Sequence, residues 1–203
     1  IRRKPMLVSE QEIPWSRRTT SEEPQVTIID IHTHAYTRKY LEILREQGGE
    51  YGLKIRPDGF EEIFRGETPV AFPQPGHFDY DIRIKQMADT GIDMSIVSLT
   101  CPNVYWGGKN TSILAAEESN NAMAEAQTAY PARLRWFTSL PWQYPDAAIE
   151  ELERSCVLGA VGVMVLANVA GRSLTDAFFA PVWEEIDRRK LPVLLHPTDP
   201  PGA

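Results

Sequence analysis

The chain has 203 residues, of which 42% are hydrophobic and 24% charged, and its formal net charge is −7. This composition is typical of a globular protein with a sizeable core. An acidic chain without an extended cluster of lysine and arginine is not expected to bind nucleic acid or an anionic membrane surface. We expect no membrane span and no secretory signal, and two distant cysteines are expected as free thiols in the cytoplasm.

Residues 1–25 are polar, contain three prolines and one tryptophan, and are predicted to form an arm that is either loose or laid across a neighbouring subunit. Beyond them, short apolar strands alternate with amphipathic helices. Strands are predicted at 26–32, 93–99, 133–140, 159–166 and 191–196. Helices are predicted at 36–47, 79–91, 111–130, 145–157 and 175–189.

Three details qualify this pattern. Residues 49–78 have no sustained period and contain glycine and proline throughout, so an irregular and functional excursion is expected there. Asp79 is predicted to cap its helix, whose apolar stripe runs through Ile82, Ile84, Met87 and Ala88. Pro181 is expected to make the helix at 175–189 irregular.

Alternation of strands and helices implies a parallel sheet, because each crossover needs a helix to return the chain. Two α/β architectures fit five strands, a doubly wound open sheet and a (β/α)8 barrel. Five strands are too few to close a barrel of eight, so the barrel requires further strands outside this chain.

Two histidines, His32 and His34, lie one residue apart at the end of the first predicted strand, and His196 ends the fifth. Residues i and i+2 of a strand point to the same face, and the carboxyl ends of parallel strands meet at one rim. Three imidazoles at one rim are typical of a catalytic zinc site with an open position for water. The alternative is a solvent-facing strand end that happens to carry polar residues. For Asp30 we expect a bond to a backbone or to a ligand, and for His77 a surface or capping role.

Six further residues are candidate substrate contacts, because they follow predicted strands or lie in the irregular segment. They are Arg65, Tyr105, Trp106, Lys109, Asn168 and Asp199. Arg65 could clamp a carboxylate, because a guanidinium binds it through two parallel hydrogen bonds. The alternatives are a turn-forming role for Asp199 and solvated loop positions for the others.

The chain resembles the amidohydrolase superfamily, in the branch of aminocarboxymuconate semialdehyde decarboxylase and the γ-resorcylate and carboxyvanillate decarboxylases. The resemblance covers residues 26–199 and rests on an ordered series of motifs. These are IDIHTH, FDYDIRIKQMADTGIDMSIVSL, the YW pair at 105–106, NNAMAEAQTAYPARLRWFTSLPWQYPDAAIEELER, GAVGVMVLANVAG and FAPVWEEIDRRKLPVLLHPTD.

The resemblance implies a TIM barrel of the metal-dependent hydrolase type, of which this chain supplies about the first five βα units. Residues 26–203 would then be the amino-terminal part of a single catalytic domain. His32, His34 and His196 match ligands of one divalent ion, usually zinc and in some members manganese. The remaining histidine and aspartate ligands, and the general acid or base, are expected beyond Ala203. Because the fourth strand ends in MVLAN without a bridging lysine or glutamate, a single ion is expected.

The leading expectation is a metal-dependent decarboxylase of an unsaturated or aromatic carboxylic acid, in which Arg65 or Lys109 orients the acid group. The runner-up is a hydrolase or hydratase that uses metal-bound hydroxide on a carbonyl, lactone or amide, since one fold supports both chemistries. A non-catalytic binding or scaffold protein is the third. Relatives suggest a dimer or larger homo-oligomer.

Overall fold

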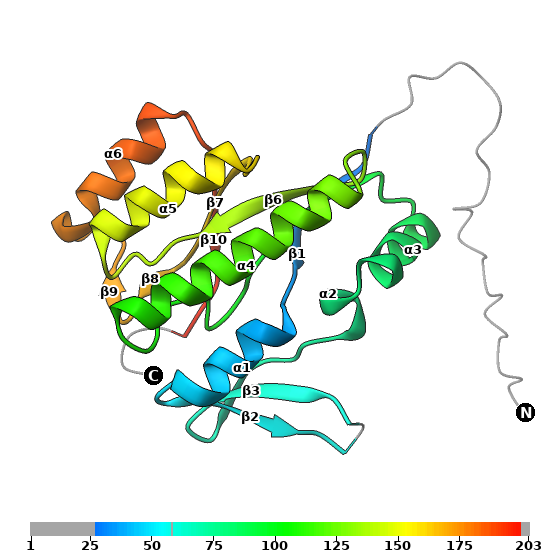
Figure 1. Ribbon diagram of the computed structural model, residues 1–203, viewed down its shortest axis with the longest axis horizontal. Coiled ribbons are helices and arrows are strands. Elements are labelled where there is room, and N and C mark those ends of the chain that lie inside the picture. The colour runs from blue at the N-terminus through cyan, green and yellow to red at the C-terminus, as the bar shows by residue number, and fades with distance from the viewer. Residues whose placement is uncertain (1–26, 58, 200–203) are drawn as a thin grey trace, which may run out of the picture.

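A computed structural model describes residues 27–57 and 59–199, and the predicted arm at 1–25 lies outside them (Figure 1). Five parallel strands form the central sheet in the order β1–β5–β6–β7–β10. Their bounds are β1 Ile29–His34, β5 Met94–Ser98, β6 Leu134–Ser139, β7 Gly162–Leu166 and β10 Val193–His196. All five predicted strands therefore exist, and they pair in parallel.

Helices occupy every crossover between these strands. Their bounds are α1 Arg38–Gln47, α2 Pro75–Phe78, α3 Tyr80–Thr90, α4 Lys109–Ala129, α5 Pro145–Val157 and α6 Ala180–Arg188. Figure 1 shows α4, α5 and α6 side by side over one face of the sheet. As predicted, the Asp79 carboxylate caps α3 by accepting from the backbone N–H groups of Asp81 and Ile82, and Gly91 ends the helix with a φ of 74°.

The sheet is strongly curled. In a flat sheet, four steps of ~4.8 Å would separate the outer strands β1 and β10 by roughly 19 Å. Instead, His34 on β1 and His196 on β10 approach each other to 3.2 Å between their Nε2 atoms. Side chains of first and fifth strands can meet in this way only across the inside of a barrel. The fold is therefore half of a (β/α)8 barrel, and the open doubly wound sheet is wrong.

Within the residues that the structure describes, both outer strands of the half-barrel pair on one side only. Their apolar side chains are unusually exposed: Ile29 is 48% and Ile31 52% exposed on β1, while Val193 is 37% and Leu195 58% exposed on β10. The side chains of the inner strand β7, by contrast, are all buried.

The segment at 49–78 is ordered, and its prediction as an irregular excursion was wrong. It forms an antiparallel sheet of β2 (Tyr51–Ile55), β3 (Glu61–Arg65) and β4 (Thr68–Ala71). The glycines and prolines that obscured the pattern lie in strands as well as in turns, and each strand is too short to show a clear alternation. Packing supplies the missing signal, because Ile63 is fully buried in the main core beside α1 residues.

Two smaller corrections concern the end of the chain. Pro181 lies in the first turn of α6, where its missing N–H costs nothing, and a 3₁₀ turn at Ala177–Phe179 precedes it. Pro181 therefore starts the helix and does not distort it. A short hairpin of β8 (Asn168–Val169) and β9 (Arg172–Ser173) follows β7 and was not predicted. Within the described residues, no helix is long and apolar enough to cross a membrane.

Candidate metal centre

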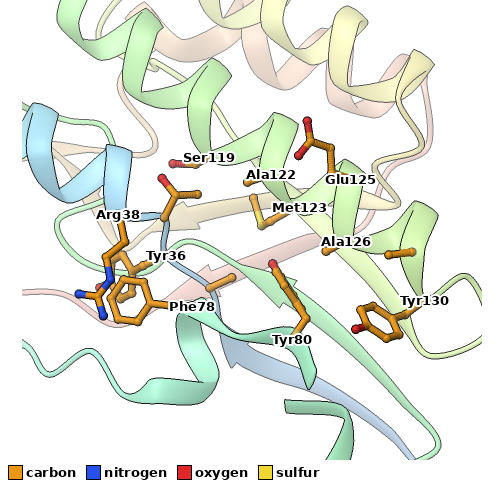
Figure 2. A pocket seen from close by; sticks show the side chains of 13 residues that line it. Tyr36, Arg38, Phe78, Tyr80, Ser119, Ala122, Met123, Glu125, Ala126 and Tyr130 are labelled. Carbon is orange, nitrogen blue, oxygen red and sulfur yellow. The ribbon is translucent and has the colours of Figure 1, made fainter. Parts of the chain in front are cut away.

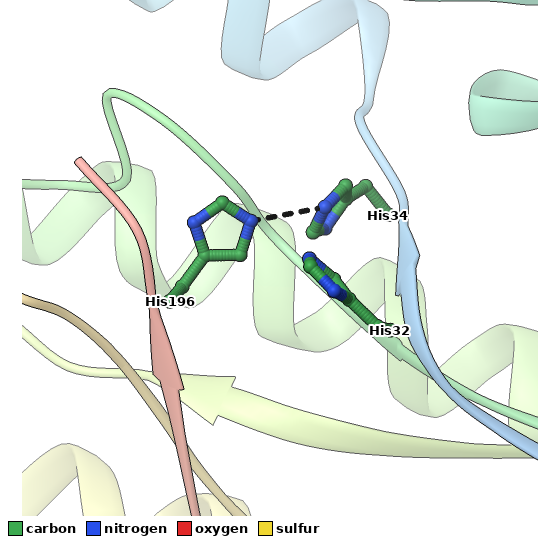
Figure 3. Close-up of side chains that lie close together, drawn as sticks. All are labelled: His32, His34 and His196. Atoms are coloured by element: carbon green, nitrogen blue, oxygen red, sulfur yellow. Dashed lines mark hydrogen bonds between the residues drawn. The ribbon is translucent and has the colours of Figure 1, made fainter.

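Three histidine side chains converge where β1 and β10 end (Figure 3). One nitrogen from each of His32, His34 and His196 lies within 4.8 Å of the others, and the ring centroids are 4.9–5.1 Å apart. His32 is exposed, whereas His34 and His196 are half-buried. The structure thus brings together the three residues that the sequence singled out, although they are separated by up to 164 positions.

An irregularity in β1 sets the direction of the first two imidazoles. Asp30 is opposite Ser95 and Thr33 is opposite Val97, so three steps along β1 match two steps along β5. Such a bulge turns a strand and re-aims its side chains. The Asp30 carboxylate accepts a hydrogen bond from the backbone N–H of His32 at 3.0 Å, which fixes the turn. Asp30 thus binds a backbone group, one of the two roles expected for it.

The protonation of the two half-buried rings follows from their neighbours. Nδ1 of His196 is 2.7 Å from the carbonyl oxygen of Pro197, which can only accept, so Nδ1 carries the proton and Nε2 keeps its lone pair. Nδ1 of His34 faces Ser98, whose hydroxyl oxygen is 3.4 Å away. Burial, followed by the nearby imidazoles of His196 and His32, lowers the pKa of His34 to about 3. Burial also lowers the pKa of His196.

This donor set fits a divalent ion. Neutral imidazoles are the form that binds metals, and the Nε2 atoms of His34 and His196 lie 3.2 Å apart. Nitrogens that share a tetrahedral ion at ~2.1 Å lie about 3.4 Å apart. A proton on one of these two nitrogens, or a cation shared by both, satisfies the pair. The three histidines therefore have the identity and the spacing of a ligand set.

Arg83 supports the site from behind and was missed by the sequence analysis. Its guanidinium donates to the Thr33 hydroxyl at 2.6 Å and to the carbonyl of His34, and it is only 5% exposed. The predicted stripe of α3 is confirmed at Met87, which is buried, and wrong at Ile82 and Ala88, which are exposed, while Arg83 is buried instead. Periodicity could not find Arg83, since a buried cation looks like a solvent-facing one in sequence.

The loop after β5 carries three of the predicted substrate contacts. Tyr105 and Trp106 are buried in the main core, at 9% and 4% exposure, and the Trp106 indole donates to the Asn103 carbonyl at 2.7 Å. Lys109 is exposed and is the first residue of α4, two residues earlier than the predicted start. The structure therefore gives the two aromatic residues a packing role, and their contact with substrate stays a prediction.

Of the other predicted contacts, Arg65 is the last residue of β3, and Asn168 and Asp199 follow the ends of β7 and β10. Arg65 is exposed and forms an ion pair with Glu50 at 3.0 Å. A hollow of about 440 Å³ brings Arg65 together with Asp199. The Asn168 side chain donates to the Asp199 backbone carbonyl at 2.8 Å and accepts from Gly171 N–H. Asn168 and Asp199 are thus joined to each other, and within the described residues neither forms a hydrogen bond with an imidazole.

A separate hollow of about 460 Å³ lies between α4, the segment before α1 and the start of α3 (Figure 2). Alanines and Met123 of α4 face the rings of Tyr36, Phe78, Tyr80 and Tyr130 across it. None of the three converging histidines lines this hollow. This hollow is therefore separate from the candidate metal centre.

Comparison with known proteins places the chain in a family. Residues 29–202 match the amidohydrolase family model, and the chain belongs to that family. Over 132 residues it is 38% identical to a γ-resorcylate decarboxylase from Rhodococcus jostii, a match that covers 59% of this chain and 40% of that protein. Over 192 residues it is 28% identical to a 2-amino-3-carboxymuconate-6-semialdehyde decarboxylase from Dictyostelium discoideum, covering 86% and 50%.

A solved decarboxylase structure also resembles this chain. The 5-carboxyvanillate decarboxylase from Novosphingobium aromaticivorans, with bound manganese and 3-methoxy-4-hydroxy-5-nitrobenzoic acid, superposes with a TM-score of 0.69 at 25% identity. That match covers 87% of this chain and 52% of the other. The resemblance to the decarboxylase branch therefore stands. The chain spans about half the length of the curated relatives it matches.

Proposed function

We propose that the protein is a metal-dependent decarboxylase of an aromatic or unsaturated carboxylic acid. The convergence of His32, His34 and His196 at the mouth of the half-barrel is the observation that carries the proposal. The matched relatives support it, because those described above are all decarboxylases of such acids.

The three imidazoles would hold one divalent ion. Zinc is the first choice, because neutral imidazole nitrogens suit it. Manganese is the second, because one solved relative contains it. The ion would act as a Lewis acid that stabilises negative charge on oxygen. The chain's own contribution is the placement of neutral donors: Arg83 and Ser98 hold His34, and the Pro197 carbonyl fixes the tautomer of His196.

In the proposed reaction the bond between the carboxylate carbon and the substrate carbon breaks. The bonding electrons stay on the substrate, CO2 leaves, and a proton is added to that carbon. Arg65 or Lys109 is proposed to orient the acid group, because both are exposed cations. Tyr105, Trp106, Asn168 and Asp199 remain proposed contacts with the rest of the substrate. The acid that delivers the proton is proposed to come from residues beyond Ala203, in further strands that would complete the barrel.

The competing proposal is a hydrolase or hydratase on the same scaffold. Incubating the metal-loaded full-length protein with γ-resorcylate in ¹⁸O-labelled water separates the two. A decarboxylase yields CO2 and a product without ¹⁸O in its carbon skeleton. Incorporation of ¹⁸O into the organic product, without loss of CO2, would refute the decarboxylase.

We further propose a cytoplasmic homo-oligomer. Light scattering coupled to gel filtration of the full-length protein would test the second part, and a monomer at micromolar concentration would contradict it.

A further inference from the structure

A hydroxyl group lies directly against the third histidine of the cluster. Thr100 follows β5, is only 8% exposed, and places its Oγ1 3.2 Å from Nε2 of His196. This is the same nitrogen that faces His34. Because Nδ1 of His196 carries the proton, Nε2 can only accept. Thr100 is therefore the donor in this contact.

The backbone around Thr100 is fixed from several sides. The carbonyl of Thr100 accepts from Asn103 N–H at 2.6 Å, and the Tyr36 hydroxyl donates to the carbonyl of Cys101 at 2.8 Å. The Asn103 carbonyl accepts from the Tyr40 hydroxyl and from the Trp106 indole. These contacts hold the loop in one place, so Thr100 cannot move far from the histidines. Its hydroxyl proton can still rotate about the Cβ–Oγ1 bond.

The Thr100 hydroxyl has this acceptor only while the Nε2 lone pair of His196 is free. Once that lone pair is used in coordination, the O–H must turn to another acceptor. A buried donor without a partner is costly, and an oxygen of a substrate bound at the three histidines would give the Thr100 hydroxyl its acceptor.

We propose that Thr100 is a positioning residue that donates its hydroxyl hydrogen bond to a carboxylate or phenolate oxygen of the substrate bound at the three histidines. This inference rests on the proposed function. It names the substrate group that the site recognises, an anionic oxygen, and it assigns one residue to it.

The consequence is a pair of opposite effects. Thr100→Val keeps the side-chain volume and removes the donor. In the metal-free protein it removes a hydrogen bond that competes with coordination, so Zn²⁺ and Mn²⁺ should bind about fivefold more tightly. In the metal-loaded protein it removes a hydrogen bond to an anionic oxygen, so γ-resorcylate should bind about tenfold more weakly.

Both affinities are measured by titration calorimetry on the full-length protein, with chelator competition for the metals. Thr100→Ser retains the hydroxyl and should leave both affinities within about twofold of wild type. Thr111→Val is the matched control: Thr111 is also buried, but its hydroxyl donates to Gln47 at 2.7 Å, and neither affinity should change. If thermal melting shows that Thr100→Val is unfolded, Thr100→Ala removes the same hydroxyl with less bulk.

The inference would be overturned if Thr100→Val bound both the metals and γ-resorcylate as tightly as wild type does. It would also be overturned if Thr100→Val bound both more weakly. A Thr100→Ser variant that behaves like Thr100→Val would overturn it as well. In these cases the proposed function survives. If wild-type protein retains no ion, the proposed function fails and this inference fails with it. If wild type binds the metals but not γ-resorcylate, the metal measurement alone decides.

Discussion

Two polar clusters in this protein are built in opposite ways. The first, which we call the Glu151 cluster, consists of Glu151, Asn120, Ser155, Arg154 and Thr138 between α4, α5 and β6. Glu151 is 5% exposed, yet its carboxylate accepts hydrogen bonds from Asn120 at 2.6 Å and from Ser155 at 3.2 Å. It also accepts from Nε and Nη2 of Arg154, each at 2.7 Å. Every polar group there has a partner within the chain.

The histidine cluster, His32, His34 and His196, contains no carboxylate within the described residues. Burial lowers the pKa of His34 and of His196, and the Nε2 atoms of these two rings lie 3.2 Å apart. A buried polar network stabilises a fold only when all its members are satisfied. The Glu151 cluster meets that condition by itself, whereas the histidine cluster gathers three nitrogen donors that a single cation would bind together. The comparison separates a group that holds the structure from one that awaits a ligand.

The sharpest test of the comparison is His34→Ala. Loss of a direct ligand should weaken Zn²⁺ affinity by more than the 10–100-fold typical of an outer partner. An ion at 100 times its dissociation constant stabilises the wild type by about 2.7 kcal/mol, so the zinc-dependent rise in melting temperature should vanish. His77→Ala is the control, because the His77 ring accepts from Gln74 N–H at the start of α2 and is not one of the three converging histidines. If both variants retained zinc equally well, the proposal that His34 is a ligand of a metal centre would be wrong.

Glu151→Ala should act on stability and leave the metal alone. Removing one partner from a buried ion pair typically costs 3–5 kcal/mol, and we expect about 3 because Arg154 is 35% exposed. Urea unfolding measures the loss, and calorimetry should give an unchanged zinc affinity. Glu153→Ala, an exposed position on the same helix, should change stability little. A large shift in zinc affinity would show that the two clusters are coupled.

Ser98→Ala probes the outer partner of the metal centre. Ser98 is fully buried, and its hydroxyl faces Nδ1 of His34. Removing it should loosen the ring and weaken zinc affinity by about tenfold. Ser95→Ala, on the same strand and 1% exposed, serves as the matched control. If Ser98→Ala bound zinc as tightly as wild type does, the Ser98 hydroxyl would not be needed to orient the His34 ring. The backbone alone would then set that orientation.

Tyr40→Phe should have the smallest effect. It removes the hydrogen bond to the Asn103 carbonyl, which still accepts from Trp106. The acceptor is therefore not left unsatisfied, and the cost should be about 1 kcal/mol in urea unfolding. A loss several times larger would show that the loop after β5 depends on this single bond.

The sequence predicted the parallel sheet and the histidine set because both depend on local rules. Apolar strands of β-branched residues, and a histidine at the end of a strand, are visible in a single line of residues. In a barrel of eight strands the first strand faces the fifth across the inside. The sequence alone could therefore predict that His196 lies near His32 and His34.

Contacts that depend on packing could not be predicted in this way. The small sheet of β2, β3 and β4 is fixed by burial of Ile63 against the core, and its strands are too short to show a period. Arg83 can be buried because its guanidinium donates hydrogen bonds to the Thr33 hydroxyl and to the His34 carbonyl. Thr100 reaches His196 across 96 positions. Each of these pairings joins distant segments, and a single sequence shows no sign of which segments will meet.

The two open strands of the half-barrel have a consequence for how the protein is made and handled. Unpaired edges that expose Ile29, Ile31, Val193 and Leu195 are templates for pairing with other chains. A chain of residues 1–203 by itself would present such edges to its surroundings. Expression of residues 1–203 alone should therefore yield insoluble or self-associated material. Charged substitutions at Ile31 and Leu195 offer a route to a soluble fragment for structural work.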